Sequence, residues 1–274
     1  MEISPHSFHR PAAVAGMFYP GQPATLADEV TALLAQAEPW PGLAPKALIV
    51  PHAGYVYSGP IAASAYASLT PLRATIRKVV LLGPTHRVAV RGLAVPESTV
   101  FDTPLGSIPI DTALERRVLE LPQVQRSEAA HALEHSLEVQ LPFLQSVLDE
   151  FSLLPLAVGM ASDVEVAEVL DLVWGGAETL IVISSDLSHY HSYTEAQRLD
   201  HATAKQIVAL QPLASHEQAC GATPVNGLLL CAQRRGLHPR LLDLRNSGDT
   251  AGDRSRVVGY GAFAFSENDP DEQH

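Results

Sequence analysis

The chain has 274 residues, 46% of them hydrophobic, and a formal net charge of −12 at pH 7. This composition supplies a large core but argues against a nucleic-acid partner, which requires a basic stripe, and no apolar run reaches the ~18 residues that a membrane-spanning helix needs. Because there are only two cysteines and no signal-peptide pattern at the N-terminus, we expect a protein of the reducing cytoplasm.

Amphipathic helices alternate with apolar strands along the chain. In chain order we expect a helix at 23–37, a strand at 46–50, a helix at 58–69, strands at 78–82 and 92–96, an edge strand or loop at 104–109, and a helix at 111–120. Then follow a helical run at 133–150 that Pro142 kinks or interrupts, a strand at 151–158, a helix at 162–174, a strand at 179–183, helices at 194–210 and 224–235, and strands at 240–244 and 256–265. No linker or charge block divides the chain, so we predict a single α/β domain over 1–274, with 1–9 and 266–274 as flexible tails.

Three of the strands are continuously apolar and run directly into a turn that carries a histidine. The strands at 46–50, 78–82 and 179–183 lead to His52, His86 and His189, respectively. Continuous hydrophobicity is typical of parallel strands covered on both faces, and such strands place their carboxyl ends on one edge, where α/β proteins bind ligands. The sequence therefore predicts that three distant histidines converge at one edge of a central, mainly parallel sheet.

His52 and His86 occupy the same position after their strands. A buried imidazole needs a polar partner, which is either a backbone carbonyl or a metal ion. Finding the placement twice favours the metal, because two neutral imidazoles at about 2.1 Å are an ordinary start to a transition-metal site.

Asp186 and His189 lie three residues apart after the third strand, on one face if the segment turns helically. Asp186 either orients a histidine or caps a helix. His189 is either a third metal ligand or a general base.

Cys220 lies just before a helix whose first turn Pro224 marks. A helix N-terminus lowers the pKa of a thiol and favours the thiolate that binds metals. The alternative is a small buried hydrophobic residue, which is how most free cysteines behave and which suits Cys231 well.

Glu134 and Glu138 flank His135 in a stretch that superficially resembles the HExxH motif. That motif needs two histidines at i and i+4, whereas here the glutamates hold those positions, so we exclude a zincin. His135 either projects into the cleft or supports it by hydrogen bonding.

Six stretches of the chain together resemble the Memo family, whose bacterial members are called AmmeMemoRadiSam system protein B. These stretches occur in family order and are Pro11–Pro20 (PAAVAGMFYP), Pro51–Gly59 (PHAGYVYSG), Gly83–His86 (GPTH), Glu134–Pro142 (EHSLEVQLP), Ser184–His189 (SSDLSH) and Cys220-Gly221.

The resemblance implies a fold similar to that of the class III non-haem iron extradiol dioxygenases. It also implies a cleft in which His52, His86 and Cys220 bind a metal, with His189 beside them. The dioxygenases use two histidines and a glutamate as ligands, with a further histidine as base, and Cys220 stands where that glutamate would be. A thiolate shifts the preference toward softer metals, and sulfur with imidazole suits copper, zinc or ferrous iron. The resemblance implies iron or copper, with zinc as the alternative.

Two functions are compatible with this cleft. The first is a metal-dependent, dioxygenase-like redox enzyme in which His189 moves a proton while Asp186, Glu134 and His135 complete the catalytic surroundings. The second is a non-catalytic module that carries metal or binds a peptide, as animal Memo members bind phosphotyrosine-bearing receptor segments. In either case the ligand is a small molecule or a peptide, and Tyr55, Tyr57 and Tyr190 are expected to line the cleft.

Overall fold

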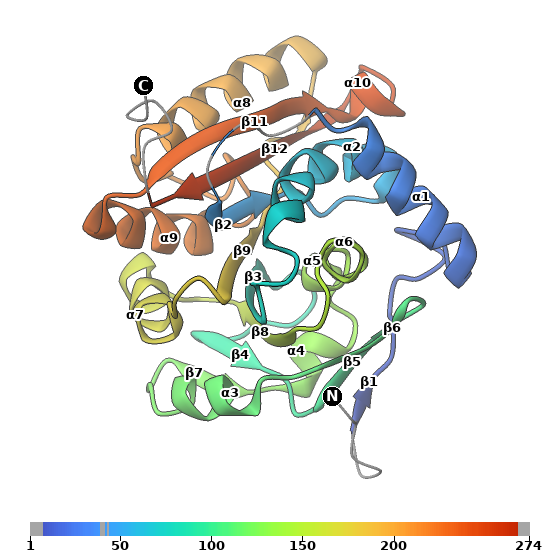
Figure 1. The fold of residues 1–274 in the computed structure, drawn as a ribbon. Helices are drawn as coiled ribbons and strands as arrows, with labels where there is room; N and C mark the ends of the chain where they lie inside the picture. Colours follow the sequence, from blue (N-terminus) through green and yellow to red (C-terminus); the bar gives the residue numbers. More distant parts are fainter. Residues whose placement is uncertain (1–7, 39–41, 43, 268–274) are drawn as a thin grey trace.

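The computed structural model of the chain describes residues 8–38, 42 and 44–267. Within these residues the main sheet has nine strands, and its four central strands are parallel to one another (Figure 1). Across the sheet they run in the order β2 (Pro45–Val50), β9 (Thr179–Ser184), β3 (Lys78–Pro84) and β8 (Ser152–Val158). The expected single-domain α/β fold with a central, mainly parallel sheet is thus confirmed.

Antiparallel pairing extends the parallel centre on both sides. Next to β2 lies β12 (Val257–Ser266), which also pairs with β10 (His189–His191) and β11 (His238–Asn246). Next to β8 lies β4 (Leu93–Val95), which pairs in turn with β7 (Val124–Arg126). A separate three-stranded sheet contains β1 (His9–Arg10), β5 (Val100–Thr103) and β6 (Gly106–Pro109).

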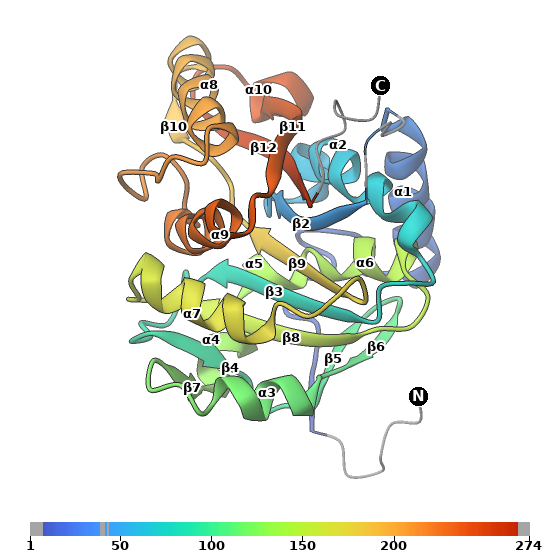
Figure 2. The ribbon, with the colours of Figure 1, turned by 60° about the vertical axis from the view of Figure 1, so that its left-hand side comes forward.

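Helices cover both faces of the main sheet. One face packs against α1 (Pro23–Gln36), α2 (Tyr55–Tyr66), α5 (His135–Glu138) and α6 (Leu141–Val147). The other packs against α3 (Thr112–Val118), α7 (Asp163–Val173), α8 (Tyr193–Val208) and α9 (Ala222–Arg235) (Figure 2). Short elements complete the described chain: the 3₁₀ helix η1 (Ala67–Leu72), α4 (Glu128–Ala132) and α10 (Ser247–Thr250).

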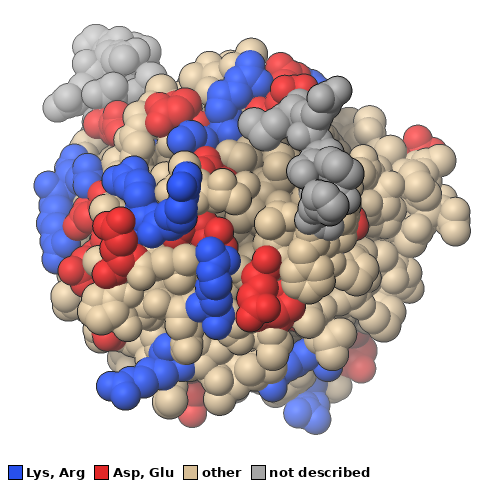
Figure 3. Space-filling view, turned by 90° about the horizontal axis from the view of Figure 1, so that it is seen from below, with Lys and Arg blue, Asp and Glu red and all other residues tan. Residues whose placement is uncertain are grey.

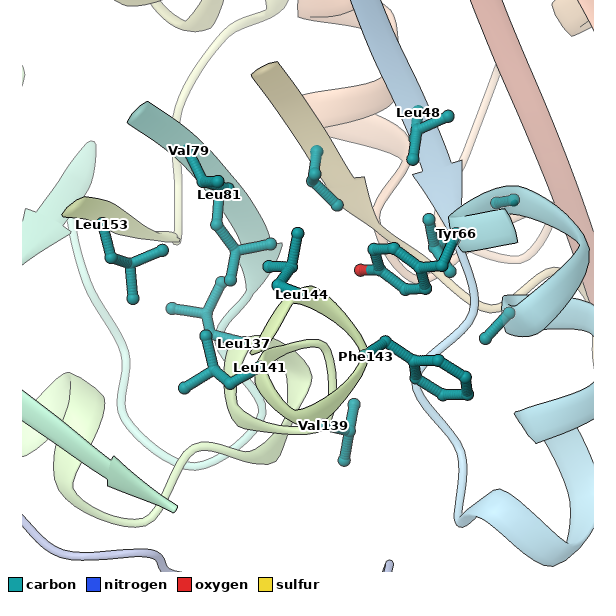
Figure 4. Packing of buried hydrophobic residues seen from close by; sticks show 14 of the residues in the cluster. Leu48, Tyr66, Val79, Leu81, Leu137, Val139, Leu141, Phe143, Leu144 and Leu153 are labelled. Atoms are coloured by element: carbon teal, nitrogen blue, oxygen red, sulfur yellow. The ribbon is translucent and has the colours of Figure 1, made fainter. Parts of the chain in front are cut away.

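The apolar central strands supply both cores at once, because successive side chains of a strand point to opposite faces. Val79 and Leu81 of β3 join the cluster under α5 and α6, which Figure 4 shows, whereas Val80 and Leu82 join the cluster under α7 and α9. Two covered faces explain why the strands read as continuous hydrophobic runs.

Two helical expectations need correction. The helix expected to start at Ser58 starts at Tyr55, so Pro60 lies inside α2. The bond that Pro60 cannot donate would have gone to Val56, an exposed residue whose carbonyl can turn to water. The run at 133–150 is interrupted, not merely kinked, since α5 and α6 are separate helices.

Two residues of the expected flexible tails are paired in strands. His9 lies in β1, paired with Val100, and Ser266 is buried at the end of β12, paired with His238. The rest of the expected tails, 1–7 and 268–274, lies outside the described residues, while Phe8 and Glu267 adjoin these strands.

Among the described residues, none of the helices has the length and hydrophobicity required to cross a bilayer. Figure 3 views the molecule from below and shows Lys and Arg side chains interspersed with Asp and Glu on that face. Charge there is locally mixed, although the whole chain is acidic.

The close contact between α7 and α9 depends on Gly227. A Cβ atom at this position would lie 2.3 Å from Cγ1 and 2.6 Å from Cβ of Val166. We predict that Gly227→Ala lowers the free energy of unfolding by about 1–3 kcal/mol through overpacking, despite the better helix propensity of alanine. Thermal or denaturant unfolding measures the change.

Gly59→Ala in α2 is the matched control. The atom closest to its added Cβ would be the terminal Cδ1 of half-buried Leu33, at 2.9 Å, and that side chain can rotate away. Equal stability of the two variants would contradict the assigned helix contact.

Candidate metal centre

The predicted convergence at one sheet edge rests on neighbouring strands. β2, β9 and β3 are adjacent and in register, with Val50 beside Ser184 and Leu82 beside Ile183. Their carboxyl ends deliver His52 and His86 with ring centroids 5.2 Å apart. Cys220, from the loop before α9, completes a group whose ligand atoms all lie within 4.8 Å of one another.

His52 is held at three points. Its backbone N–H donates to Oδ1 of Asp186 at 2.7 Å, and its Nδ1 lies 2.9 Å from Oγ of Ser184. Its Nε2 faces Sγ of Cys220 at 3.3 Å. Burial, helped by the neighbouring His86, lowers the pKa of His52 to about 3, so the ring is neutral and retains a nitrogen lone pair at neutral pH.

His86 is partly exposed and is fixed by Glu134. Its Nδ1 lies 2.8 Å from Oε1 of Glu134, and its backbone N–H donates to Oε2 at 2.6 Å. Burial opposes ionisation of Glu134, but hydrogen bonds from His86 and from the backbone of Ser136 outweigh it and lower the pKa of the carboxyl to about 2. A carboxylate bonded to Nδ1 leaves Nε2 of His86 available, as in carboxylate–histidine–metal arrangements.

Glu134 positions several neighbouring groups. Its oxygens serve two groups of His86 and the backbone N–H of Ser136, where it caps α5. It lies with His86 and His135 in a second compact group of polar atoms. Because its acceptor sites are used this way, the carboxylate orients His86.

His135 packs against the site histidines, and its Nδ1 also lies 3.3 Å from Oε1 of Glu134. Its ring lies 4.5 Å from that of His86, 5.5 Å from that of His52 and 4.8 Å from that of Phe18, measured between centroids. Burial and the adjacent His52 lower the pKa of His135 to about 4, which keeps this ring neutral too.

Cys220 is half-buried against the end of β9. Its backbone N–H donates to the carbonyl of Asp186 at 3.2 Å, and Gly221 donates to Oγ of Ser185 at 2.9 Å. A Cβ on Gly221 would lie 2.7 Å from Cβ of Ser185, so only glycine lets the cysteine loop approach this closely.

The expected lowering of the thiol pKa by the helix N-terminus is wrong for the metal-free chain. Burial, reinforced by Asp186, raises the pKa of Cys220 to about 12. Desolvation of the thiolate outweighs the helix dipole here, and a bound metal would be needed to deprotonate the sulfur. Cys231 is a buried residue of α9, as expected of a packing cysteine.

Asp186 and His189 do not lie on a helical turn. The backbone N–H of Leu187 donates to the carbonyl of Gly259, and the N–H of Gly259 donates to the carbonyl of Ser188, both at 2.8 Å. These backbone groups therefore pair with β12 and are not available for the hydrogen bonds of a helical turn. Burial raises the pKa of Asp186, whose carboxylate holds the backbone of His52. His189 lies outside the group of three ligand atoms, but it is close enough to influence the pKa of both His52 and Asp186.

The three tyrosines that were expected to line the cleft lie in different surroundings. Tyr55 is buried and donates to the carbonyl of Val139 at 2.7 Å, so the expectation that it lines the cleft is wrong. Tyr57 and Tyr190 are exposed. Tyr190 has a φ of 62°, and its ring packs edge-on against His189 at 5.8 Å.

A buried ion pair that the sequence analysis missed anchors the site. Arg10 donates to Oε2 of Glu138 at 2.7 Å and to the backbone carbonyls of His131 and Glu134. Glu138 also accepts from Tyr19 and from the backbone N–H groups of Ala13 and Val14. The available signal was a glutamate four residues after Glu134, between the apolar residues Leu137 and Val139.

Comparisons with known proteins agree on one family. The sequence model of the family described as Memo-like protein matches residues 10–264. A "MEMO1 family protein" of Aquifex aeolicus is 37% identical over 272 aligned residues, which cover 93% of this chain and 98% of the relative. Proteins of the same name from Sulfolobus acidocaldarius and, as "MEMO1 family protein MK0963", from Methanopyrus kandleri are each 34% identical, with the same two coverages.

The buried Arg10–Glu138 pair predicts a large effect of a small change. Glu138→Gln should lower the free energy of unfolding by about 3–5 kcal/mol, because it leaves the arginine charge buried without its counter-ion. Denaturant unfolding measures the loss. Glu195→Gln, which breaks only the exposed pair with Arg198, is the control and should have no measurable effect. A stable Glu138→Gln protein would contradict the anchoring role.

Proposed function

The chain belongs to the Memo-like protein family, and from that premise we propose that His52, His86 and Cys220 bind a transition-metal ion in a redox enzyme of dioxygenase-like fold. The observation that carries the proposal is the convergence of two imidazole nitrogens and one sulfur within 4.8 Å. Iron and copper are the metals that this donor set favours for redox chemistry, and zinc is the redox-inert alternative.

The residues present fit such an ion. Nδ1 of His52 and Nδ1 of His86 are already paired, with Ser184 and Glu134 respectively. Both rings are therefore oriented through Nδ1, which leaves Nε2 for a metal, as metal-binding histidines are held in known sites. Three protein donors are the number that catalytic sites use when they keep a position open for water or substrate.

The chain's own residues have separate tasks. A bound metal ion would supply a positive centre that polarises a substrate oxygen and, for iron or copper, a route for electrons. His189, which lies outside the three donors, would accept or return a substrate proton. Asp186 and Glu134 accept hydrogen bonds from the backbone N–H groups of His52 and His86, respectively. The neutral ring of His135 packs between Phe18 and the rings of the other two histidines.

Metal content tests the first part of the proposal. Protein purified without oxygen should retain about one metal ion per chain by elemental analysis, and Cys220→Ala or the double variant His52→Ala, His86→Ala should lose it. Cys231→Ala is the matched control because that thiol lies in the packing of α9, bonded to a backbone carbonyl, and should leave the content unchanged. Unchanged metal in both site variants would refute the centre.

Oxygen consumption tests the second part. The anaerobically iron-loaded protein should consume oxygen with a catechol or a small phenol, and His189→Ala should abolish this turnover without removing the metal. His201→Ala, an exposed histidine of α8, should behave as wild type. Tight metal binding without turnover on any such substrate would contradict the enzyme and favour a module that carries metal or binds a peptide.

A further inference from the structure

We infer that the buried hydrogen bonds from the Gln140 amide to Ser184 and from Ser184 to the carbonyl of Ser136 fix the tautomer of His52, with the proton on Nδ1 and the lone pair of Nε2 directed at Cys220. The tautomer is a property of the metal-free chain, and only its consequence for metal binding rests on the proposed function. Ser184 is on this view a positioning residue for His52.

The orientation of the Gln140 amide is the first step. One amide atom lies 2.9 Å from the carbonyl oxygen of Pro51, which can only accept a hydrogen bond, so that atom is the nitrogen. The amide oxygen then accepts from the hydroxyl of Tyr66 at 2.7 Å. Since an amide nitrogen has no lone pair to offer, its contact with Oγ of Ser184 at 2.8 Å makes Gln140 the donor there as well.

The second step is to locate the single proton of the Ser184 hydroxyl. Its oxygen lies 2.6 Å from the carbonyl oxygen of Ser136, which cannot donate, so the hydroxyl proton lies between these two oxygens. One lone pair of Ser184 already accepts from Gln140. The remaining lone pair faces Nδ1 of His52 at 2.9 Å, and only a protonated Nδ1 can complete that bond.

Burial makes this assignment unavoidable for the folded chain. Tyr66, Gln140, Ser136 and Ser184 are all at most 1% exposed, so water does not compete for any of the bonds. The opposite tautomer would place two lone pairs against each other beneath His52 and leave a buried polar contact unmade, which low-dielectric surroundings penalise strongly.

The consequence is a preorganised pair of ligands. Nε2 of His52 is left without a proton and lies 3.3 Å from Sγ of Cys220. A neutral network thus does for His52 what the carboxylate of Glu134 does for His86. Outer partners of this kind usually change metal affinity by 10- to 100-fold when removed.

Nitrogen-15 NMR of the metal-free protein tests the inference directly. With ¹⁵N-labelled histidine, and the His52 signals assigned by their loss in His52→Ala, we expect Nδ1 to show the protonated shift and Nε2 the lone-pair shift. A protonated Nε2 would overturn the inference, and this result needs no variant that might fail to fold.

Two variants separate positioning from stability. Ser184→Ala should release His52 into a mixture of tautomers and weaken metal binding 10- to 100-fold. Tyr66→Phe is the control: it removes only the hydrogen bond to the Gln140 amide oxygen, so it should destabilise the fold, while the Pro51 carbonyl still orients the amide and the tautomer is retained. Retention of pure Nδ1–H in folded Ser184→Ala would overturn the inference.

The results separate the proposed metal centre from the inferred tautomer of His52. If the wild type binds no metal but its His52 carries the proton on Nδ1, the inference about the tautomer is supported and the proposed function is contradicted. If the wild type binds metal through His52 but the metal-free ring carries its proton on Nε2, the inference about the tautomer is contradicted and the metal centre is supported.

Discussion

The parallel pairing of β2, β9 and β3 is the constraint on which the site depends. Because these three strands are neighbours and run in one direction, the loops that follow them meet at one edge although they are separated by up to about 130 residues. Those loops carry His52, His86 and Asp186 within two residues of the strand ends. Cys220 joins them because Gly221 lets its loop lie directly on the end of β9.

Polar side chains are buried beneath this edge of the sheet. Their desolvation costs free energy, which hydrogen bonds to buried partners offset. The structure provides such hydrogen bonds in three places, with Ser184 serving His52, Glu134 serving His86, and Glu138 serving Arg10 and the N-terminal segment. Ser184 binds groups from two distant segments, and Glu134 and Glu138 each bind one segment that is far away in the sequence. The rings are therefore held by the fold itself, before any ligand arrives.

The sequence predicted what local patterns determine. Continuous apolar runs identified the central strands, and the turns after them located His52 and His86, while Cys220 was assigned through the resemblance to the Memo family. The extended conformation after Asp186 was missed because β12, about 70 residues away, takes its hydrogen bonds. The Ser184 network was missed for the same reason, since its partners lie 44 to 132 residues away. The raised pKa of Cys220 depends on burial, which the sequence position before a helix does not reveal.

X-ray absorption at the zinc edge of the zinc-loaded protein tests the central claim most directly. Zinc has no redox chemistry that would alter Cys220, and its distances to sulfur and nitrogen differ clearly. A centre built by His52, His86 and Cys220 predicts one sulfur neighbour at about 2.3 Å together with imidazole nitrogens at about 2.0–2.1 Å. A shell of nitrogen and oxygen without sulfur would contradict it.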